Sequence, residues 1–129
     1  MNLEKNWRLF VSFLTGIFTL LSIAGHSQLS KTQLDSVSTA LSKAKEDSNK
    51  VALLLTLGNE TGYTDLKKAL AYALEGFELS KKLNFRPGIA KTAYLSGITY
   101  IDLGNHSLAD SFLNISEQLF FQLKDNKNL

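Results

Sequence analysis

Two glycines lie inside apolar segments that otherwise have the composition of helices, and they recur at nearly the spacing of a helical repeat. Gly58 lies in "LLTLGNE", and Gly97 lies in "YLSGITY", 39 residues later. An alanine follows each glycine, Ala69 after the first and Ala109 after the second, and these alanines are 40 residues apart. A glycine in a helix interior costs about 1 kcal/mol relative to alanine. Self-similarity at this spacing is typical of arrays of helix pairs.

We interpret the paired small residues as crossing points of antiparallel helices. Helix axes pack about 8–10 Å apart, and the side chains at the crossing set the distance. Small residues on both helices let the backbones approach closely. We therefore predict that Gly58 meets Ala69 and that Gly97 meets Ala109, with Ala73 a further small residue on the same face as Ala69. The alternative is that the glycines mark kinks or helix ends.

The rest of the chain after residue 28 also has a helical composition. Valine and isoleucine are sparse there, whereas Leu, Ala, Lys and Ser are abundant, which favours helix over strand. Apolar periodicity and turn residues predict five helices, over residues 31–46, 49–61, 65–83, 87–103 and 107–124. We therefore expect an all-α fold in which antiparallel helix pairs stack as a short α-solenoid.

Capping residues support these helix boundaries. Ser30 begins a capping-box pattern, and Pro87 fits the first turn of a helix, where its missing N–H group is not needed. Gly104 is typical of the glycine that follows a helix end. We expect Ser107 and Asp110 to cap the last helix.

The first 27 residues have the pattern of a secretory signal. Lys5 and Arg8 precede an uncharged apolar run over residues 9–25, and Ser27 completes a small-residue cleavage pattern. We predict cleavage near Ser27 and an extracytoplasmic location, periplasmic or secreted, for a chain beginning at Gln28. The alternative is an uncleaved segment that anchors the chain in the membrane, although the run is at the short end of the roughly 20 residues that a span requires.

The predicted organisation follows from these boundaries. It comprises a signal peptide over 1–27, an N-terminal helix over 28–48 that packs on the array, a first repeat over 49–86 and a second repeat over 87–129.

Composition and motifs argue against enzymatic and nucleic-acid chemistry. The formal net charge is +2 and cysteine is absent from the sequence, so there is no electrostatic case for nucleic acid and no thiol nucleophile. The two histidines, His26 and His106, lack the companions that a metal site requires. The sequence contains neither a phosphate-binding glycine loop nor a nucleophile elbow. We expect a non-enzyme without catalytic residues, cofactor or metal.

The order of small and aromatic residues in each helix pair resembles the tetratricopeptide repeat family. The matching residues are Gly97, Tyr100, Ala109 and Ser116 in the second unit and Gly58, Ala69 and Gly76 in the first. Thr61 stands where the first unit should have an aromatic residue, and the tryptophan of the family is replaced by Leu54 and Ala93. The resemblance covers about residues 44–124 and implies a tetratricopeptide-like solenoid.

A narrower resemblance concerns residues 45–105. They look like the tetratricopeptide regions of bacterial sensor proteins, especially in Bacteroidota, in which an extracytoplasmic array precedes a histidine kinase, cyclase or DNA-binding output domain. Two units are fewer than the three or so that a continuous core usually needs. One alternative is therefore the sensory segment of a truncated signal-transduction protein.

The favoured function is a protein-interaction module that binds a protein or peptide partner. In the tetratricopeptide family the first helix of each pair lines the concave binding surface. The resemblance implies these candidate residues: Leu55, Asn59, Lys91, Tyr94, Ile98 and Asp102. Core packing is the alternative for Leu55 and Ile98. We also expect self-association through the C-terminal helix, which carries Phe120 and Phe121, and no nucleic-acid partner.

Overall fold

The computed structural model describes residues 28–125, and within this range all of the regular secondary structure is α-helix. The helices are α2 (Lys31–Lys43), α3 (Ser48–Thr61), α4 (Leu66–Lys82), α5 (Arg86–Asp102) and α6 (His106–Asp125). The expectation of an all-α fold with five helices is confirmed. The predicted signal peptide falls on residues 1–27, outside the described range.

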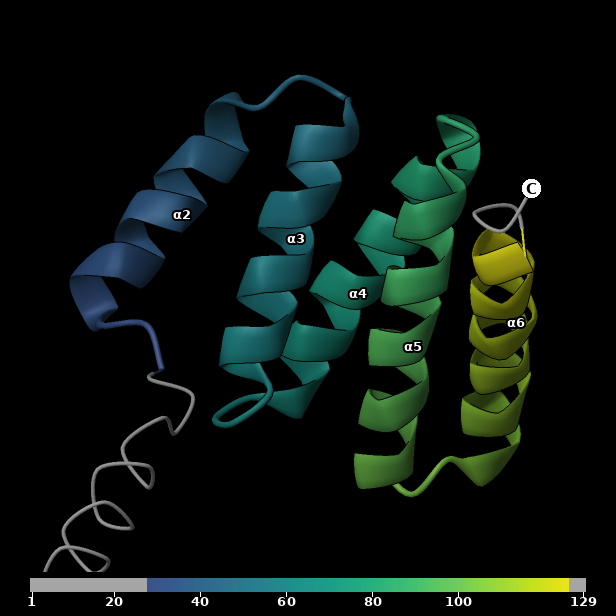
Figure 1. Cartoon of the computed structure of the whole chain (residues 1–129). Coiled ribbons are helices and arrows are strands. Elements are labelled where there is room, and N and C mark those ends of the chain that lie inside the picture. Colours follow the sequence, from purple (N-terminus) through teal and green to yellow (C-terminus); the bar gives the residue numbers. More distant parts are fainter. Residues whose placement is uncertain (1–27, 126–129) are drawn as a thin grey trace, which may run out of the picture.

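Successive helices run in alternating directions, and α4 lies behind α3 and α5 (Figure 1). Each helix packs against the next one along the chain, and α3 also contacts α5. The three helices α3, α4 and α5 therefore pack mutually, whereas α2 and α6 lie on opposite sides of this group.

A small apolar cluster joins α3 to α4. Val51, Leu54 and Leu79 are buried at its centre. Partly buried side chains pack around them, from Leu41, Leu55, Tyr72, Leu83 and Phe85. Full burial of one aliphatic side chain stabilises a fold by about 1.5–3 kcal/mol, so this cluster is a main source of cohesion between α3 and α4.

Three predicted helix-end features are confirmed. The Ser30 hydroxyl accepts the backbone N–H of Gln33 at 3.3 Å while the Gln33 side chain accepts the N–H of Ser30 at 2.9 Å, which completes the capping box. Pro87 lies in the first turn of α5. Gly104 follows the end of α5 with φ +78°, a left-handed conformation that glycine adopts without strain.

The prediction for the last helix cap is wrong. The side chain of Asn105 accepts the backbone N–H of Leu108 at 3.2 Å, and α6 begins at His106. Ser107 and Asp110 therefore lie inside the helix. Asparagine is among the best N-cap residues, and its place directly after Gly104 lets the chain turn and restart at once.

The first helix ends earlier than predicted, at Lys43 instead of residue 46. Ala44 is already extended, with ψ 139°. Asp47 accepts the backbone N–H groups of Asn49 and Lys50 at 2.9 and 3.1 Å and so caps α3. Because that cap needs extended backbone, the residues before it cannot remain helical.

The glycines lie at close helix contacts. A Cβ atom added to Gly97 would lie 2.6 Å from Leu113 Cγ and 3.3 Å from the carbonyl oxygen of Ala109. One added to Gly58 would lie 2.7 Å from Leu95 Cδ2 and 3.4 Å from the carbonyl oxygen of Ala69. Ala69, Ala73 and Ala109 are all buried. The structure thus brings each glycine against the backbone of its paired alanine and also places a leucine over it.

Candidate functional site

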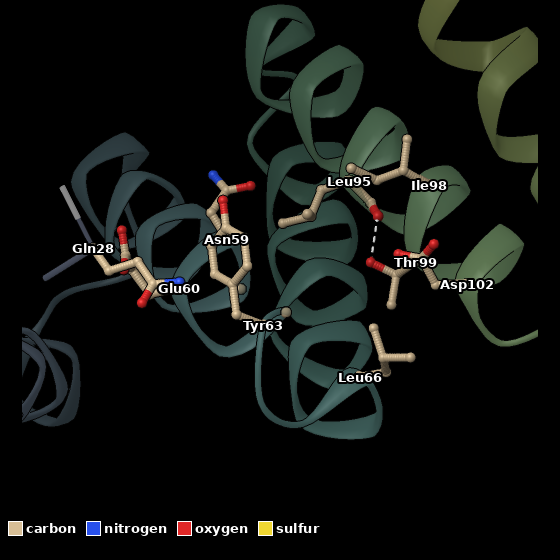
Figure 2. A pocket seen from close by; sticks show the side chains of 11 residues that line it. Gln28, Asn59, Glu60, Tyr63, Leu66, Leu95, Ile98, Thr99 and Asp102 are labelled. Atoms are coloured by element: carbon tan, nitrogen blue, oxygen red, sulfur yellow. Dashed lines mark hydrogen bonds between the residues drawn. The ribbon is translucent and has the colours of Figure 1, made fainter. Parts of the chain in front are cut away.

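A groove of about 550 Å³ opens between α3 and α5 on the side away from α4 (Figure 2). The turn from α3 to α4 closes its foot, and residues before α2 reach its edge. It is lined by Gln28, Gly58, Asn59, Glu60, Gly62, Tyr63, Leu66, Leu95, Ile98, Thr99 and Asp102.

The floor of the groove is apolar and tightly packed. Leu95 is buried, and its side chain lies over Gly58, where any Cβ atom would collide with it. The buried hydroxyl of Thr99 donates to the Leu95 carbonyl oxygen at 2.7 Å, so its hydrogen-bonding need is met within α5. Since α3 and α5 are in direct contact here, the floor is preformed.

The rim of the groove is polar. Asn59 and Tyr63 stand on the α3 side and Asp102 stands on the α5 side (Figure 2), whereas the half-buried Ile98 of α5 belongs to the apolar floor. Tyr63 is 66% exposed. Glu60 and Asp102 contribute two carboxylates, and none of the described residues that line the groove is basic. The groove is therefore locally negative.

A non-helical segment of the chain already makes a hydrogen bond at this site. The backbone N–H of Leu29 donates to Glu60 Oε2 at 3.0 Å, and the neighbouring Gln28 lines the groove. A main-chain N–H group of an extended segment can therefore reach the carboxylate at one edge.

The structure brings three of the six predicted concave-surface residues together, namely Asn59, Ile98 and Asp102. Leu55 instead packs against the core cluster. Lys91 is exposed on α5 and does not line the groove. Tyr94 lies on α5 beside a second hollow, which faces α6.

Sequence reasoning missed several groove residues. Tyr63 lies in the turn between α3 and α4, and Leu66 is the first residue of α4; the family resemblance assigns neither of them to the binding surface. The available signal was the exposed tyrosine four residues after Asn59. Leu95 was missed because Gly58 was paired only with an alanine on the next helix, whereas the structure adds a contact from α5.

The second hollow lies between α5 and α6 and has a volume of about 690 Å³. Its lining is largely apolar and aromatic, from Tyr94, Leu113, Glu117, Phe120, Phe121 and Lys124. Contiguous exposed apolar surface of this kind marks interaction sites in soluble proteins.

Within residues 28–124, the side chains of His, Asp and Glu form no group of three that could hold a metal ion. None of the helices described is both long enough and apolar enough to cross a membrane. No protein-family model, curated protein or solved structure matches the chain.

Proposed function

We propose that the protein is a non-enzymatic interaction module of the tetratricopeptide type, and that it binds an extended peptide segment of a partner protein between α3 and α5. The observation that carries this proposal is the groove itself. It combines a preformed apolar floor with a negative rim, and the Leu29 N–H group already bonds to that rim.

The arrangement of the helices supports a solenoid. Helices α3 and α5 lie beside each other and both border the groove, while α4 lies behind them (Figure 1). Stacked helix pairs present their first helices on a common surface in this way. An aromatic cluster also links the units, because Phe112 of α6 packs edge-on to Phe77 of α4 at 5.2 Å and stacks with Tyr100 of α5 at 5.6 Å.

The charges at the rim favour a partner segment that carries Lys or Arg. The exposed carboxylate of Asp102 can accept a charge-assisted hydrogen bond. The exposed ring of Tyr63 can hold a cation for about 0.5–1 kcal/mol. An aliphatic side chain next to the basic residue would cover the apolar floor at Leu95 and Ile98. Asn59 offers both a donor and an acceptor for the peptide main chain.

A random peptide library displayed on a surface and selected on the purified chain tests this proposal. We expect enrichment of peptides in which Lys or Arg neighbours an aliphatic residue. Asp102→Lys should weaken their binding by at least about tenfold, or 1.4 kcal/mol, and Asn59→Ala should weaken it in the same direction. Lys91→Ala, an exposed change on α5 outside the groove, should leave the affinity unchanged.

Two results would overturn the peptide-binding proposal. One is a selection in which the wild-type chain enriches no peptides beyond those that Asp102→Lys also enriches. The other is a set of enriched peptides that bind wild type and Asp102→Lys equally. Because Asn59 and Asp102 are exposed, matching thermal unfolding curves would show that any loss of binding is not a loss of fold.

We also propose that the module works outside the cytoplasm after signal cleavage. The support is the basic, apolar and small-residue pattern of residues 1–27. Mass spectrometry of the protein from its native host should find an N-terminus at or near Gln28. Intact Met1 in the membrane fraction would instead establish the uncleaved anchor.

A further inference from the structure

The side of α6 that borders the second hollow carries an exposed aromatic centre between two opposite charges. Phe120 is 41% exposed and Phe121 is 67% exposed. Glu117 precedes Phe120 by three residues, and Lys124 follows Phe121 by three. Residues at these spacings share one helix face. We call this stripe, residues Glu117, Phe120, Phe121 and Lys124, the α6 face.

We propose that two copies of the chain pair through the α6 face, with the two helices antiparallel and a twofold axis between Phe120 and Phe121. A twofold interface brings the same surface of both copies together. Each position before the axis then lies opposite the equally distant position after it in the other copy. Glu117 of each copy therefore faces Lys124 of the other, and the phenylalanines meet at the centre.

The charge pattern selects this orientation over a parallel one. In a parallel pair with matched register, Glu117 would face Glu117 and Lys124 would face Lys124, which repels. The antiparallel pair converts both contacts into attraction. The ion pairs within the described residues involve Lys50–Glu75, Lys81–Glu78 and Lys82–Glu46, so they leave the charges of the α6 face to a partner.

The second hollow extends the interface beyond the stripe. Tyr94 of α5 is 52% exposed, and Leu113 lies one turn before Glu117 on α6. Aromatic side chains bury about 150–250 Å² each when fully covered, and these rings are already partly covered. The buried area therefore falls near or below the roughly 1,200 Å² at the lower end of stable interfaces. We expect a weak dimer that depends on concentration.

Charge reversal tests both the dimer and its geometry. In the dimer of Glu117→Lys, each new lysine side chain lies opposite Lys124 of the other copy. In the dimer of Lys124→Glu, each new glutamate side chain lies opposite Glu117. Sedimentation over a concentration series should therefore show each variant alone associating at least about tenfold more weakly than wild type.

Mixing the two variants should restore association. In a mixed dimer one charge pair joins two native residues, and the other joins the two substituted ones with their signs exchanged, so both pairs attract. An equimolar mixture of Glu117→Lys and Lys124→Glu should therefore associate as wild type does. The chain that carries both substitutions should regain wild-type association too.

A matched pair of apolar variants tests the centre of the interface. Phe121→Ser should weaken association, whereas Ile115→Ser, 37% exposed on the opposite side of α6, should not. All variants have the same N-terminus as the wild-type sample, so any association through residues 1–27 is the same in each. A wild-type monomer at every concentration would overturn the proposal, as would a mixture of charge variants that stays monomeric, or an equal effect of Ile115→Ser.

Discussion

Gly97 shows how a residue that weakens an isolated helix can favour a packed one. Carbon atoms normally approach to about 3.5–4.0 Å, yet a Cβ atom here would lie 2.6 Å from Leu113 Cγ. The missing methyl group lets Leu113 of α6 lie directly on the backbone of α5. The same relation joins Gly58 of α3 to Leu95 of α5. At these positions the close packing of a leucine on the backbone outweighs the lower helix propensity of glycine.

Replacement of Gly97 in two backgrounds tests this balance. Gly97→Ala should lower the free energy of unfolding by up to about 2 kcal/mol, because an overpacking cost of about 1–3 kcal/mol is offset by a propensity gain of only about 1 kcal/mol. In a Leu113→Ala background the leucine obstruction is gone and only the 3.3 Å approach to the Ala109 carbonyl oxygen remains, so Gly97→Ala should cost less there than in wild type or stabilise by up to about 1 kcal/mol. Urea denaturation of the four chains gives both values. Destabilisation of equal size in both backgrounds would refute the role of Leu113.

Replacement by alanine can be compared at two buried serines whose hydroxyl groups differ in hydrogen bonding. The hydroxyl of Ser96 is buried in α5 and has no hydrogen-bond partner among the residues that the structure describes. The hydroxyl of Ser116 donates from α6 to the carbonyl oxygen of Ala90 in α5 at 2.9 Å. An unsatisfied buried hydroxyl costs about 1–3 kcal/mol, whereas a satisfied one contributes about 0.5–1.5 kcal/mol.

We therefore predict that Ser96→Ala raises the free energy of unfolding by about 0.5–1.5 kcal/mol, while Ser116→Ala lowers it by about 0.5–1 kcal/mol. Chemical denaturation of both variants beside wild type provides the measurement. The prediction fails if the two variants shift stability in the same direction.

At the scale of single helices, the sequence predicted existence and approximate ends because apolar periodicity and caps are local properties. It predicted the small residues at the helix crossings, such as Ala69 and Ala109, but not which of the other residues of each helix are buried. The contact residues of α5 are small or weakly polar, including Thr92, Ser96 and Thr99, because this helix packs against three others. In α6 the residues Phe120 and Phe121, through which we expect self-association, are exposed, whereas the buried residues are Ala109 and Ser116. An apolar stripe indicates a face that can be covered, whereas small residues indicate where a neighbour is present.

The residues of the candidate groove also fall into two groups, those that the sequence predicted and those that depend on tertiary contacts. Asn59, Ile98 and Asp102 follow from helix register and the family resemblance, because they lie on the first helix of each pair. Tyr63 and Glu60 belong to the site because the turn folds back and the segment before α2 reaches α3. These features depend on tertiary contacts that no local pattern encodes.

An exposed ion pair fastens the turn between α2 and α3 to the end of α4. Lys82 donates a hydrogen bond to Glu46, and this bond together with the lysine charge lowers the pKa of Glu46 below its ordinary value of 4.5. A lowered pKa in the folded protein means that the stabilisation is fully present above pH 4.5 and is lost as the pH falls through the lowered pKa.

We predict that wild type is more stable than Glu46→Gln near neutral pH and that this small difference disappears in acid, as the pH falls through the lowered pKa of Glu46. Urea denaturation at a series of pH values measures it. Lys81→Gln, which removes the pair with Glu78 and the cation–π contact with Phe77, both within α4, should leave the pH dependence of wild type unchanged. A difference between wild type and Glu46→Gln that stays constant down to strong acid would contradict this assignment.

At the scale of the whole molecule, contacts follow chain order. Helix α2 packs only on α3 among the described helices, whereas α5 contacts α3, α4 and α6. None of the residues of α2 is buried. In the solenoid that we propose, stability would be close to a sum of local and nearest-neighbour terms. Different parts of the chain should therefore open at different free energies, with α2 lowest.

Two leucine truncations test that gradient by amide hydrogen exchange read out by mass spectrometry. Leu41→Ala removes a partly buried contact between α2 and the core cluster, so it should speed exchange in α2 and leave α5 and α6 as protected as in wild type. Leu54→Ala removes a fully buried side chain from the centre of that cluster and should cost about 2–5 kcal/mol. Its effect should reach α3 and α4 first and α5 through their shared interfaces, because every one of these helices touches the other two. Uniform loss of protection from α2 to α6 in Leu41→Ala would mean that the five helices unfold as one cooperative unit.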